Sequence, residues 1–447
     1  MLIVFQYAFR QRSSTTGADL SRATVPVEMK SGQPGNCVSM TSGIRTIAVA
    51  SVNDPGDTKT WSGIPAHIGH AFAAAQVNVV QGGPLPAHEP SYYRWLRSTN
   101  WRLGRGWFLS DVEPRILRQR AIALRSILDS RPADAVISIW ADPIAEISPS
   151  IPSALVHDCT FALLVDYYQQ FTRLTRRSVR FGHEAYERAL EHASTSIYSS
   201  EWAAQSAIRD YGADPAKVHV VEFGANLLDP PSRTESLRLV DSRMLRGEYR
   251  FLFLGVDWAR KGGDDAVALI KSLRRMGISA SLDIAGCAMQ GNSESREFCF
   301  EYGFLDKSKR EDSAKLKRLF ESASFLLVPS LAECYGCVYC EANAYGIPAI
   351  GRDTGGVSQI IRPGINGFLL TRDGNMDALA EQIRPCLIDP DRYRSLAMSS
   401  RNEYETRLNW GRFVNKTLQL FEATAGKSCP GNEIAEDKSG SRKPATV

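Results

Sequence analysis

The chain has 447 residues, which is long for a single hydrophobic core and predicts two or three domains. Hydrophobic residues make up 43% and charged residues 23%, and no apolar run reaches the roughly 18 residues that a membrane-spanning helix needs. The net charge of +4, with acids and bases mixed along the chain, argues against a nucleic-acid-binding protein. Nine cysteines, an odd number spread over a long chain, favour reduced thiols and a cytoplasmic location.

Both ends of the chain are polar and rich in residues that break regular structure. We therefore predict a disordered N-terminal extension over residues 1–45 and a disordered tail over residues 427–447. The N-terminus has a short apolar patch without a basic residue before it or a small-residue cleavage pattern after it, so it does not resemble a signal peptide. Met40, just before the first clear strand, is an alternative start.

From Thr46 onward, short β-branched runs alternate with helical segments. The runs in the first half are TIAVASV, VNVVQ, AVISIW, ALVHD, STSIYSS and VHVVEF, and after a polar stretch the pattern restarts with YRFLFLG, SLDIAG, FLLVPS and IPAIG. This alternation is typical of parallel sheets covered by helices on both faces. We predict an α/β fold with two doubly wound, Rossmann-like domains, over residues 46–228 and 249–426, joined by a linker over 229–248. The last helix could pack back on the first domain, and a ligand would bind in the central cleft, beyond the carboxyl ends of the strands.

The segment PSLAECYGCVYCEANAYGIPA, residues 329–349, contains three cysteines at C-x2-C-x2-C spacing. This spacing suggests a metal or iron–sulfur site at Cys334, Cys337 and Cys340. On a helix, however, the cysteines would be about 4.5 Å apart along the axis and would turn by about 60° each time, so three thiolates could not surround one ion. The fourth cysteine followed by proline, which a bacterial iron–sulfur motif needs, is absent from this position. We predict that the cysteines pack in the core and that no metal is bound; a metal-binding protein remains the alternative.

Two glutamates, Glu333 and Glu341, bracket these cysteines. On a helix they would be about 12 Å apart. That is too far for the carboxylate pair of a glycoside hydrolase, whose members lie roughly 5–9.5 Å apart. The separation suits two ends of one extended ligand, such as a sugar and a nucleoside.

The stretch PSLAECYGCVYCEANAYGIPAIGRDTGGVSQIIRPGINGFLL, residues 329–370, closely resembles the E-x7-E segment of retaining nucleotide-sugar glycosyltransferases with the GT-B fold, glycosyltransferase family 4. Three further stretches resemble the same family in the same order: WSGIPAHIGHAF, IYSSEWAAQSAIRDYGADPAKVHVVEFGAN and FLFLGVDWARKGGDDAVALI. The resemblance covers roughly residues 46–425 and is more specific in the C-terminal half. It implies a GT-B fold, with an acceptor-side domain over 46–228 and a nucleotide-sugar-binding domain over 249–426, and transfer with retention of anomeric configuration.

For the second domain, the resemblance implies that Glu341 holds the ribose hydroxyls of a donor and that Glu333 lies beside the donor sugar. Lys261 matches the lysine that binds the donor diphosphate, where a fixed cation would stabilise the leaving group without a metal. The backbone amides of Gly336, Cys337 and Val338, at the start of a helix, would face the same diphosphate. Val256 stands where the family commonly has an arginine, and Arg260 could supply that guanidinium instead.

For the first domain, the resemblance assigns Gly63 to the turn that approaches the phosphate or sugar, although WSG replaces the usual double glycine. His157 matches the histidine that reaches the donor sugar or the reaction centre. Asp158 beside it could contact the acceptor or cap a turn. FGAN, residues 223–226, stands where the family usually has Asn-Gly-Val-Asp.

These residues predict a metal-independent, retaining transferase that moves a hexose-type unit from a nucleotide diphosphate sugar to a sugar, lipid-linked or small-molecule hydroxyl acceptor, in surface polysaccharide or glycolipid synthesis. The alternatives are a GT-B nucleotide-sugar epimerase and a non-catalytic protein that binds nucleotide sugar or metal. The arginine-rich stretch over 171–193 is a solvated helix face or a peripheral contact with anionic lipid at the inner membrane face.

Overall fold

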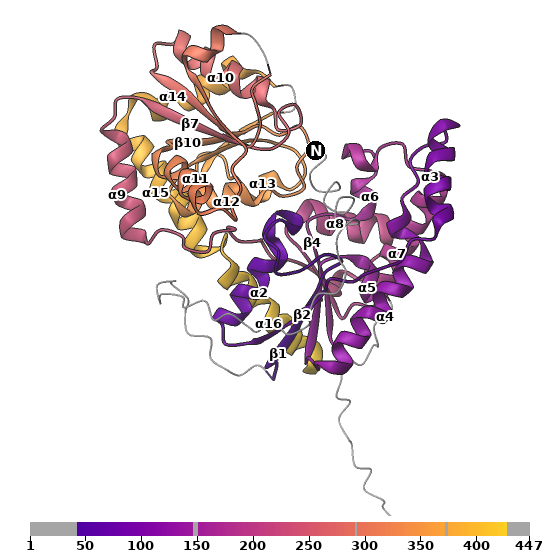
Figure 1. Ribbon diagram of the computed structural model, residues 1–447. Coiled ribbons are helices and arrows are strands. Elements are labelled where there is room, and N and C mark those ends of the chain that lie inside the picture. The colour runs from indigo at the N-terminus through magenta and orange to yellow at the C-terminus, as the bar shows by residue number, and fades with distance from the viewer. Residues whose placement is uncertain (1–42, 146–150, 291–292, 372–373, 427–447) are drawn as a thin grey trace, which may run out of the picture.

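The computed structural model describes residues 43–145, 151–290, 293–371 and 374–426 (Figure 1). The extensions predicted to be disordered, 1–45 and 427–447, lie outside these ranges except for residues 43–45. The described chain forms two six-stranded sheets, one in each half, and every strand pair in both sheets is parallel.

The first sheet has the strand order β2-β1-β3-β4-β5-β6. Its strands are β1 (Thr46–Ala50), β2 (Asn78–Gly82), β3 (Ala135–Ser138), β4 (Ser153–His157), β5 (Thr195–Tyr198) and β6 (Val218–Val220). Its helices are α2 (Ile64–Ala74), α3 (Ser91–Arg102), α4 (Pro114–Ser130), α5 (Ala141–Ile144), α6 (Phe161–Leu164), α7 (Arg176–His192) and α8 (Glu201–Tyr211). The central strands β3 and β4 are buried along their whole length, as expected for apolar runs in a sheet covered on both faces.

The second sheet has the order β12-β11-β10-β7-β8-β9. Its strands are β7 (Tyr249–Leu254), β8 (Ala280–Ala285), β9 (Cys299–Gly303), β10 (Phe325–Val328), β11 (Ala349–Arg352) and β12 (Gly367–Leu370). The helices of this half are α9 (Arg233–Met244), α10 (Gly263–Arg275), α11 (Arg310–Ser322), α12 (Cys337–Ala344), α13 (Val357–Ile360), α14 (Met376–Ile388), α15 (Pro390–Thr406) and α16 (Trp410–Gly426). Short 3₁₀ turns connect several elements: η2 (Thr60–Gly63), η3 (Ser110–Val112), η4 (Gln169–Phe171), η5 (Pro215–Lys217) and η6 (Ser293–Glu297).

Alternate residues of the first sheet face two different cores. Ile47 and Val49 of β1 pack in the core that includes α2 and α16, whereas Ala48 and Ala50 pack in the core that includes α4 and α7. Helices α2 and α16 therefore cover one face of the sheet, and α4, α5 and α7 cover the other (Figure 1). The prediction of two doubly wound α/β domains is confirmed.

The segment 229–248, which we expected to link the domains, contains the helix α9. Its start carries a capping box, in which the Ser232 side chain accepts from the Glu235 amide and the Glu235 carboxylate accepts from the Ser232 amide. Near its end, the buried Arg243 guanidinium donates to backbone carbonyl oxygens at the C-termini of α11 and α12, including those of Phe320 and Tyr345. Because cations stabilise helix C-termini, α9 fixes the position of α12.

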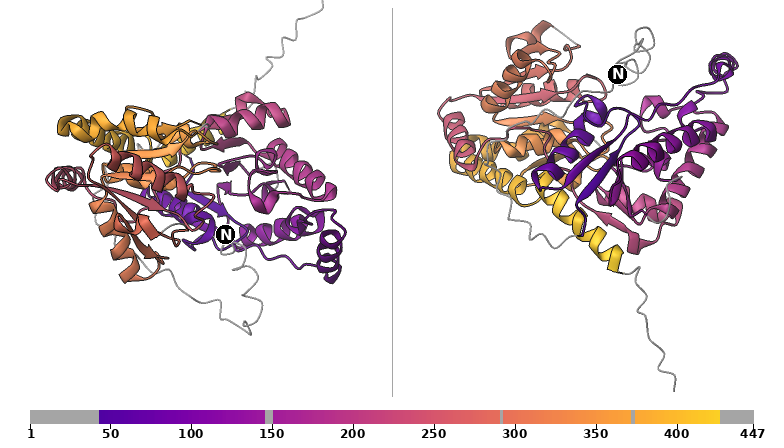
Figure 2. Two further views of the ribbon diagram at one scale, coloured as in Figure 1. Left: turned by 90° about the horizontal axis from the view of Figure 1, so that it is seen from above. Right: turned by 60° about the horizontal axis from the view of Figure 1, so that its bottom comes forward.

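The last helix, α16, returns to the first domain and lies along α2, as both figures of the whole chain show (Figures 1 and 2). Trp410, at its start, stacks on Phe223 with ring centroids 5.6 Å apart and donates from Nε1 to Asn226 Oδ1 at 3.1 Å. The FGAN loop therefore packs against the chain where it crosses back between the domains.

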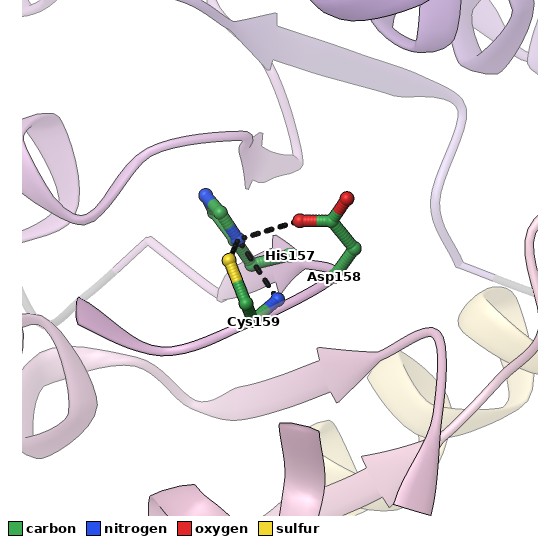
Figure 3. A group of neighbouring side chains, drawn as sticks. All are labelled: His157, Asp158 and Cys159. Atoms are coloured by element: carbon green, nitrogen blue, oxygen red, sulfur yellow. Dashed lines mark hydrogen bonds and ion pairs between the residues drawn. The ribbon is translucent and has the colours of Figure 1, made fainter. Parts of the chain in front are cut away.

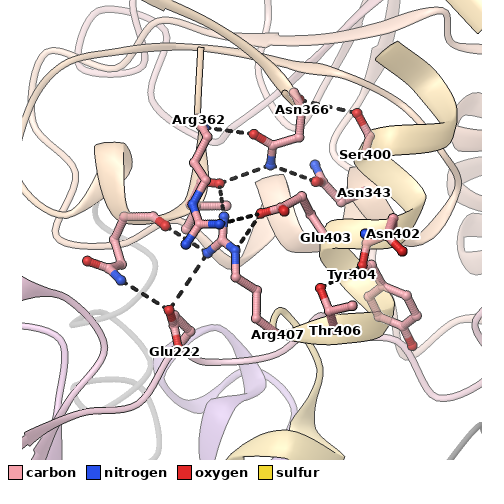
Figure 4. A network of polar contacts seen from close by, with 12 residues as sticks. Glu222, Asn343, Arg362, Asn366, Ser400, Asn402, Glu403, Tyr404, Thr406 and Arg407 are labelled. Atoms are coloured by element: carbon pink, nitrogen blue, oxygen red, sulfur yellow. Dashed lines mark hydrogen bonds and ion pairs between the residues drawn. The ribbon is translucent and has the colours of Figure 1, made fainter. Parts of the chain in front are cut away.

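A polar network lies beside this crossing (Figure 4). Arg407 pairs with Glu403, and its two terminal nitrogens donate at 2.8 Å to the carbonyl oxygens of Gln359 and Ile360. The Glu222 carboxylate of the first domain lies 3.8 Å from the Arg407 guanidinium and accepts a hydrogen bond from the side-chain amide of Gln359 at 3.1 Å. The network joins the end of β6 to α13 and α15, and thus holds the two domains together on this side.

Candidate functional site

A buried charged cluster lies where the two domains meet. Glu333 follows β10 and Lys261 follows β7, two adjacent strands, and the Lys261 Nζ atom forms an ion pair with Glu333 Oε2. Ser330 Oγ also donates to that oxygen, at 3.2 Å. Burial by itself raises the pKa of Glu333, but the Lys261 and Arg260 charges outweigh it and hold the pKa below its usual value. Glu333 is therefore a carboxylate, fixed in position by a cation.

Arg260 completes this cluster. Its Nη1 atom donates to the Ala332 carbonyl at 2.9 Å and lies 3.9 Å from Glu333 Oε2. Its backbone amide donates to Asp257 Oδ1 at 3.0 Å, which closes the turn after β7. Val256, in the position that is commonly arginine in the resembling family, is 42% exposed. The Arg260 guanidinium thus lies beside Glu333, and its contact with a donor diphosphate stays a prediction. We call Arg260, Lys261 and Glu333 the Glu333 cluster.

The helix α12 begins directly after this cluster. Gly336 precedes it with φ of +94°, and a Cβ atom there would lie 2.6 Å from the Tyr339 ring, so glycine is required. The backbone amides of Gly336, Cys337 and Val338 precede the first hydrogen bonds inside the helix, so they have no acceptor within α12. Together with the positive end of the helix dipole, they make a site suited to an anion.

Glu341 lies on α12 and is almost fully buried. Its two carboxylate oxygens accept from Lys307 Nζ at 3.1 and 3.3 Å. Burial raises the pKa of Glu341, and the Lys307 charge opposes that shift. Sequence reasoning did not find Lys307, because it comes from the loop after β9, outside every matched motif.

The turn before α2 contains three consecutive residues in the left-handed region: Trp61, Ser62 and Gly63, with φ of 43°, 58° and 86°. Such a conformation is costly for the first two, on the order of 1–3 kcal/mol each. Asn226 of the FGAN loop donates to the Ser62 carbonyl at 2.9 Å and so helps to hold the turn. Gly63 is the N-cap residue of α2.

His157 is the last residue of β4 and is buried beside this turn (Figure 3). Its ring centroid lies 5.1 Å from that of Trp61 and 5.3 Å from that of Trp140. The Nδ1 atom accepts from the Cys159 amide at 3.1 Å, so in the neutral imidazole the proton is on Nε2. Figure 3 shows that Nε2 points away from Asp158 and Cys159. Nε2 is thus the atom that can donate to a ligand.

Asp158 Oδ1 lies 3.2 Å from His157 Nδ1, and Cys159 Sγ lies close to both atoms. Among the described residues this is the one cluster in which at least three potential metal-ligand atoms lie within 4.8 Å of one another. However, the His157 Nδ1 atom already accepts a hydrogen bond from the Cys159 amide, and burial raises the pKa of the Cys159 thiol, which favours the protonated form that binds metals poorly. These contacts do not favour a metal ligand set.

The three cysteines of the C-x2-C-x2-C stretch point to different surroundings. Cys334 packs with Cys159 and Leu164 of the first domain. The Cys340 thiol lies 3.6 Å from the Phe223 carbonyl oxygen and 3.8 Å from the Tyr335 hydroxyl. Cys337 is buried at the start of α12, and burial raises the pKa of its thiol. All three side chains are buried, as predicted for cysteines that pack in the core.

Two tyrosines of the first domain, between α6 and η4, contact the loop that carries Glu333. The Tyr167 hydroxyl accepts from the Glu333 amide at 2.9 Å and lies 3.2 Å from the Glu333 carbonyl oxygen. The Tyr168 hydroxyl accepts from the Cys334 amide at 3.0 Å. Sequence reasoning missed both residues, since loop tyrosines carry no spacing signal. They tie the position of Glu333 to the packing of the two domains.

The fold and the position of these residues define a two-domain protein with the GT-B fold. Sucrose-phosphate synthase from Thermosynechococcus elongatus has a similar structure, with a TM-score of 0.58 at 18% identity, covering 86% of this chain and 100% of that chain. The structure of Alr3699/HepE from Anabaena in complex with UDP gives a TM-score of 0.52 at 15% identity, with 86% and 99% covered. At these identities the likeness concerns the fold.

Sequence comparison links the second domain to a protein family. Residues 242–403, which include Glu333, Glu341 and Lys261, match the family described as "Glycosyl transferases group 1". The chain is 26% identical over 258 residues to the D-inositol 3-phosphate glycosyltransferase of Nocardiopsis dassonvillei, a stretch that covers 55% of this chain and 59% of that relative. The alignment thus spans less than two thirds of the relative. The segment that matches this family thus contains the Glu333 cluster and α12.

Proposed function

We propose that the protein is a retaining glycosyltransferase that moves a hexose-type sugar from a nucleotide diphosphate sugar to a hydroxyl group of a sugar, lipid-linked or small-molecule acceptor. The observation that carries this proposal is the buried Glu333 cluster beside the amides at the start of α12. It places two cations and a helix N-terminus around one position, and a diphosphate is the ligand whose charge and size suit them. The UDP in the structure of the Anabaena protein supports a nucleotide donor.

The nucleoside would lie toward Glu341. A buried carboxylate with two acceptor oxygens can accept from both ribose hydroxyls, and Lys307, which occupies those oxygens in the free chain, would give way. Because Glu341 and the amides are on the same short helix, ribose and diphosphate would be held in one fixed relation. The sugar would then extend toward Glu333 and His157.

In the transfer step, the bond between sugar C1 and the leaving phosphate oxygen breaks, and a bond forms between C1 and the acceptor oxygen on the same face. The acceptor proton passes to the leaving phosphate oxygen. Lys261 and Arg260 stabilise the charge that develops on the diphosphate, so the step needs no metal ion. Glu333 is held by its cations and orients the sugar, and His157 Nε2 donates to a sugar hydroxyl. A role in surface polysaccharide or glycolipid synthesis, in the cytoplasm, belongs to the same proposal.

Turnover of candidate donors tests this function. Purified protein with EDTA is incubated with UDP-, GDP- and ADP-sugars and a panel of hydroxyl acceptors, and both nucleotide release and the product anomer are followed. The proposal predicts release with one nucleotide class, retention of configuration, and loss of release in Glu341→Ala. Donor isomerisation without release would instead identify an epimerase. No turnover, with nucleotide binding intact, would identify a non-catalytic nucleotide-sugar protein.

A further inference from the structure

Large apolar side chains are exposed together on α3 and the turn that follows it. Among them, the exposed fraction is 64% for Trp95, 59% for Trp101 and 40% for Trp107, with Tyr92 and Leu103 also exposed. The helix projects from the outer end of the first domain, away from the second domain (Figures 1 and 2). A group of exposed tryptophans on one element is unusual for a surface that faces only water and indicates a contact site. We call residues 91–107 the α3 surface.

The outward position of these rings is fixed by the fold. Tyr93 of α3 is buried and packs against Phe108 with ring centroids 5.4 Å apart. Arg97 donates to Glu89 at 3.0 Å and to Ser110 at 2.8 Å. These contacts hold one side of the helix on the domain, so the tryptophan rings face outward in the folded protein.

The α3 surface is strongly basic. Residues 91–107 contain four arginines and no acidic residue; Arg97 forms an ion pair with Glu89, and Arg94, Arg102 and Arg105 are exposed. A hollow of about 290 Å³ lies on this surface, with a lining of Arg94, Arg97, Ser98, Trp101 and Trp107. It combines arginine and indole groups in one depression, a combination that suits a phosphate group carried by an apolar molecule.

The start of α7 extends the same surface. The Trp107 amide donates to the Arg173 carbonyl at 2.7 Å, and the Thr175 amide donates to the Trp107 carbonyl at 3.0 Å. Arg173 and Arg176 are exposed and, within the described residues, form no ion pair, whereas Arg177 pairs with Glu113. Arg173 and Arg176, from the arginine-rich stretch 171–193, thus lie close to the exposed Trp107.

We propose that the α3 surface docks the protein on an anionic lipid membrane. Tryptophan is enriched at the interface of bilayers, and arginines near it bind anionic headgroups. A second copy of the chain is a poor partner for this surface, because a symmetric dimer would bring the same arginines of both copies together. A contact made by exposed tryptophans and arginines of one helix is peripheral. In the described part of the chain no helix has the length and apolar character for a membrane crossing. Docking does not depend on sugar transfer, so its failure and that of the proposed function are distinguishable.

Vesicle flotation of the full chain tests docking directly. Vesicles of phosphatidylcholine alone are compared with vesicles that also contain phosphatidylglycerol, at low and high salt. We expect flotation with the anionic vesicles at low salt and a strong decrease at high salt. In the triple variant R94Q/R102Q/R105Q, binding to anionic vesicles should fall about 100-fold, because each arginine near an anionic surface contributes on the order of fivefold. A W95S/W101S variant should lose about tenfold or more.

Two control variants remove exposed cations or exposed apolar side chains outside the α3 surface. R310Q/K317Q/R318Q removes three exposed cations of α11, and L245S/I388S removes two exposed apolar side chains of the second domain. Both should float as the wild type does, and nucleotide binding should be unchanged in the α3 variants. Failure to float, or an equal decrease in controls and α3 variants, would overturn the proposal. So would a concentration-dependent dimer lost in W95S/W101S, or binding to soluble polyanions without binding to vesicles.

Discussion

Replacing Lys261 by methionine tests whether the Glu333 cluster is organised as the structure has it. The substitution keeps the length of the side chain and removes the cation from a pair in which the lysine side chain is 12% exposed and the glutamate side chain 11%. Glu333 would remain buried, with Arg260 Nη1 at 3.9 Å and the Ser330 hydroxyl at 3.2 Å as its partners.

The expected cost follows from these contacts. Removing one partner of a buried ion pair costs about 3–5 kcal/mol. Arg260 and Ser330 compensate in part, and the carboxyl group can take up a proton, so we expect a loss of about 2–3 kcal/mol in the free energy of unfolding at neutral pH. For a domain of about 150–250 residues, such a loss corresponds to a decrease of about 4–12 °C in Tm.

The variant and the wild type should also differ in how their stability depends on pH. In the wild type the pKa of Glu333 is lowered, so its contribution to stability is present above the unfolded-state pKa and is lost as the pH falls through the folded-state pKa. In Lys261→Met burial would prevail and raise that pKa. Its stability relative to wild type should therefore decrease as the pH rises above about 4.3, the pKa of an unperturbed glutamate.

Chemical denaturation of wild type, Lys261→Met, Glu333→Gln and the double variant measures the coupling between the two residues. We expect a coupling free energy of about 1–3 kcal/mol. Lys271→Met, which removes an exposed lysine of α10, is the control and should change stability by less than about 0.5 kcal/mol. A Lys261→Met variant as stable as Lys271→Met, or additive double-variant energies, would refute the proposed organisation of the cluster.

Three further predictions concern Tyr167, the buried His67 on α2, and Gly336. Tyr167→Phe leaves the Glu333 amide without its acceptor, a cost of about 1–3 kcal/mol; kcat should fall about tenfold while the Kd for nucleotide stays within about twofold, and an equal change in both would contradict a positioning role. Burial lowers the pKa of His67 to about 3, so its contribution to stability is lost as the pH falls below about 6.5; in denaturation experiments wild type should lose about 2 kcal/mol more than His67→Asn between about pH 7 and pH 5, and parallel losses would disprove this. Gly336→Ala should weaken nucleotide binding in calorimetry and destabilise the protein by about 1–3 kcal/mol, whereas Gly247→Ala, also at positive φ but in open space, should leave binding intact.

The fold could be predicted from the sequence because its signal is repeated along the chain. Each central strand is a short apolar run followed by a helical segment, and burial on both faces makes that pattern continuous. The helix α9 was missed, since its residues are polar and few of them reach the core. Ser232 and Glu235 carry the capping-box spacing that could have revealed it.

The site was predictable where it depends on local sequence. Glu333, Gly336 and Glu341 belong to one loop and helix, and Lys261 follows a neighbouring strand, so the fold alone brings them together. Tyr167 and Lys307 come from loops whose course is set by contacts between the domains, and no local pattern indicates those contacts. The exposure of the tryptophans on α3 likewise depends on how Tyr93 and Arg97 hold that helix on the domain.

Calorimetric titration of UDP, GDP and ADP into the protein in the presence of EDTA tests whether the Glu333 cluster and α12 bind a nucleotide diphosphate. We expect one of these nucleotides to bind, Lys261→Met and Glu341→Ala each to weaken its binding about 10- to 100-fold through lost charge-assisted hydrogen bonds, and Lys271→Met to bind it as wild type does. Equal affinity in all four proteins, or no binding of any nucleotide by the wild type, would contradict the assignment of the Glu333 cluster and α12 as a nucleotide diphosphate site.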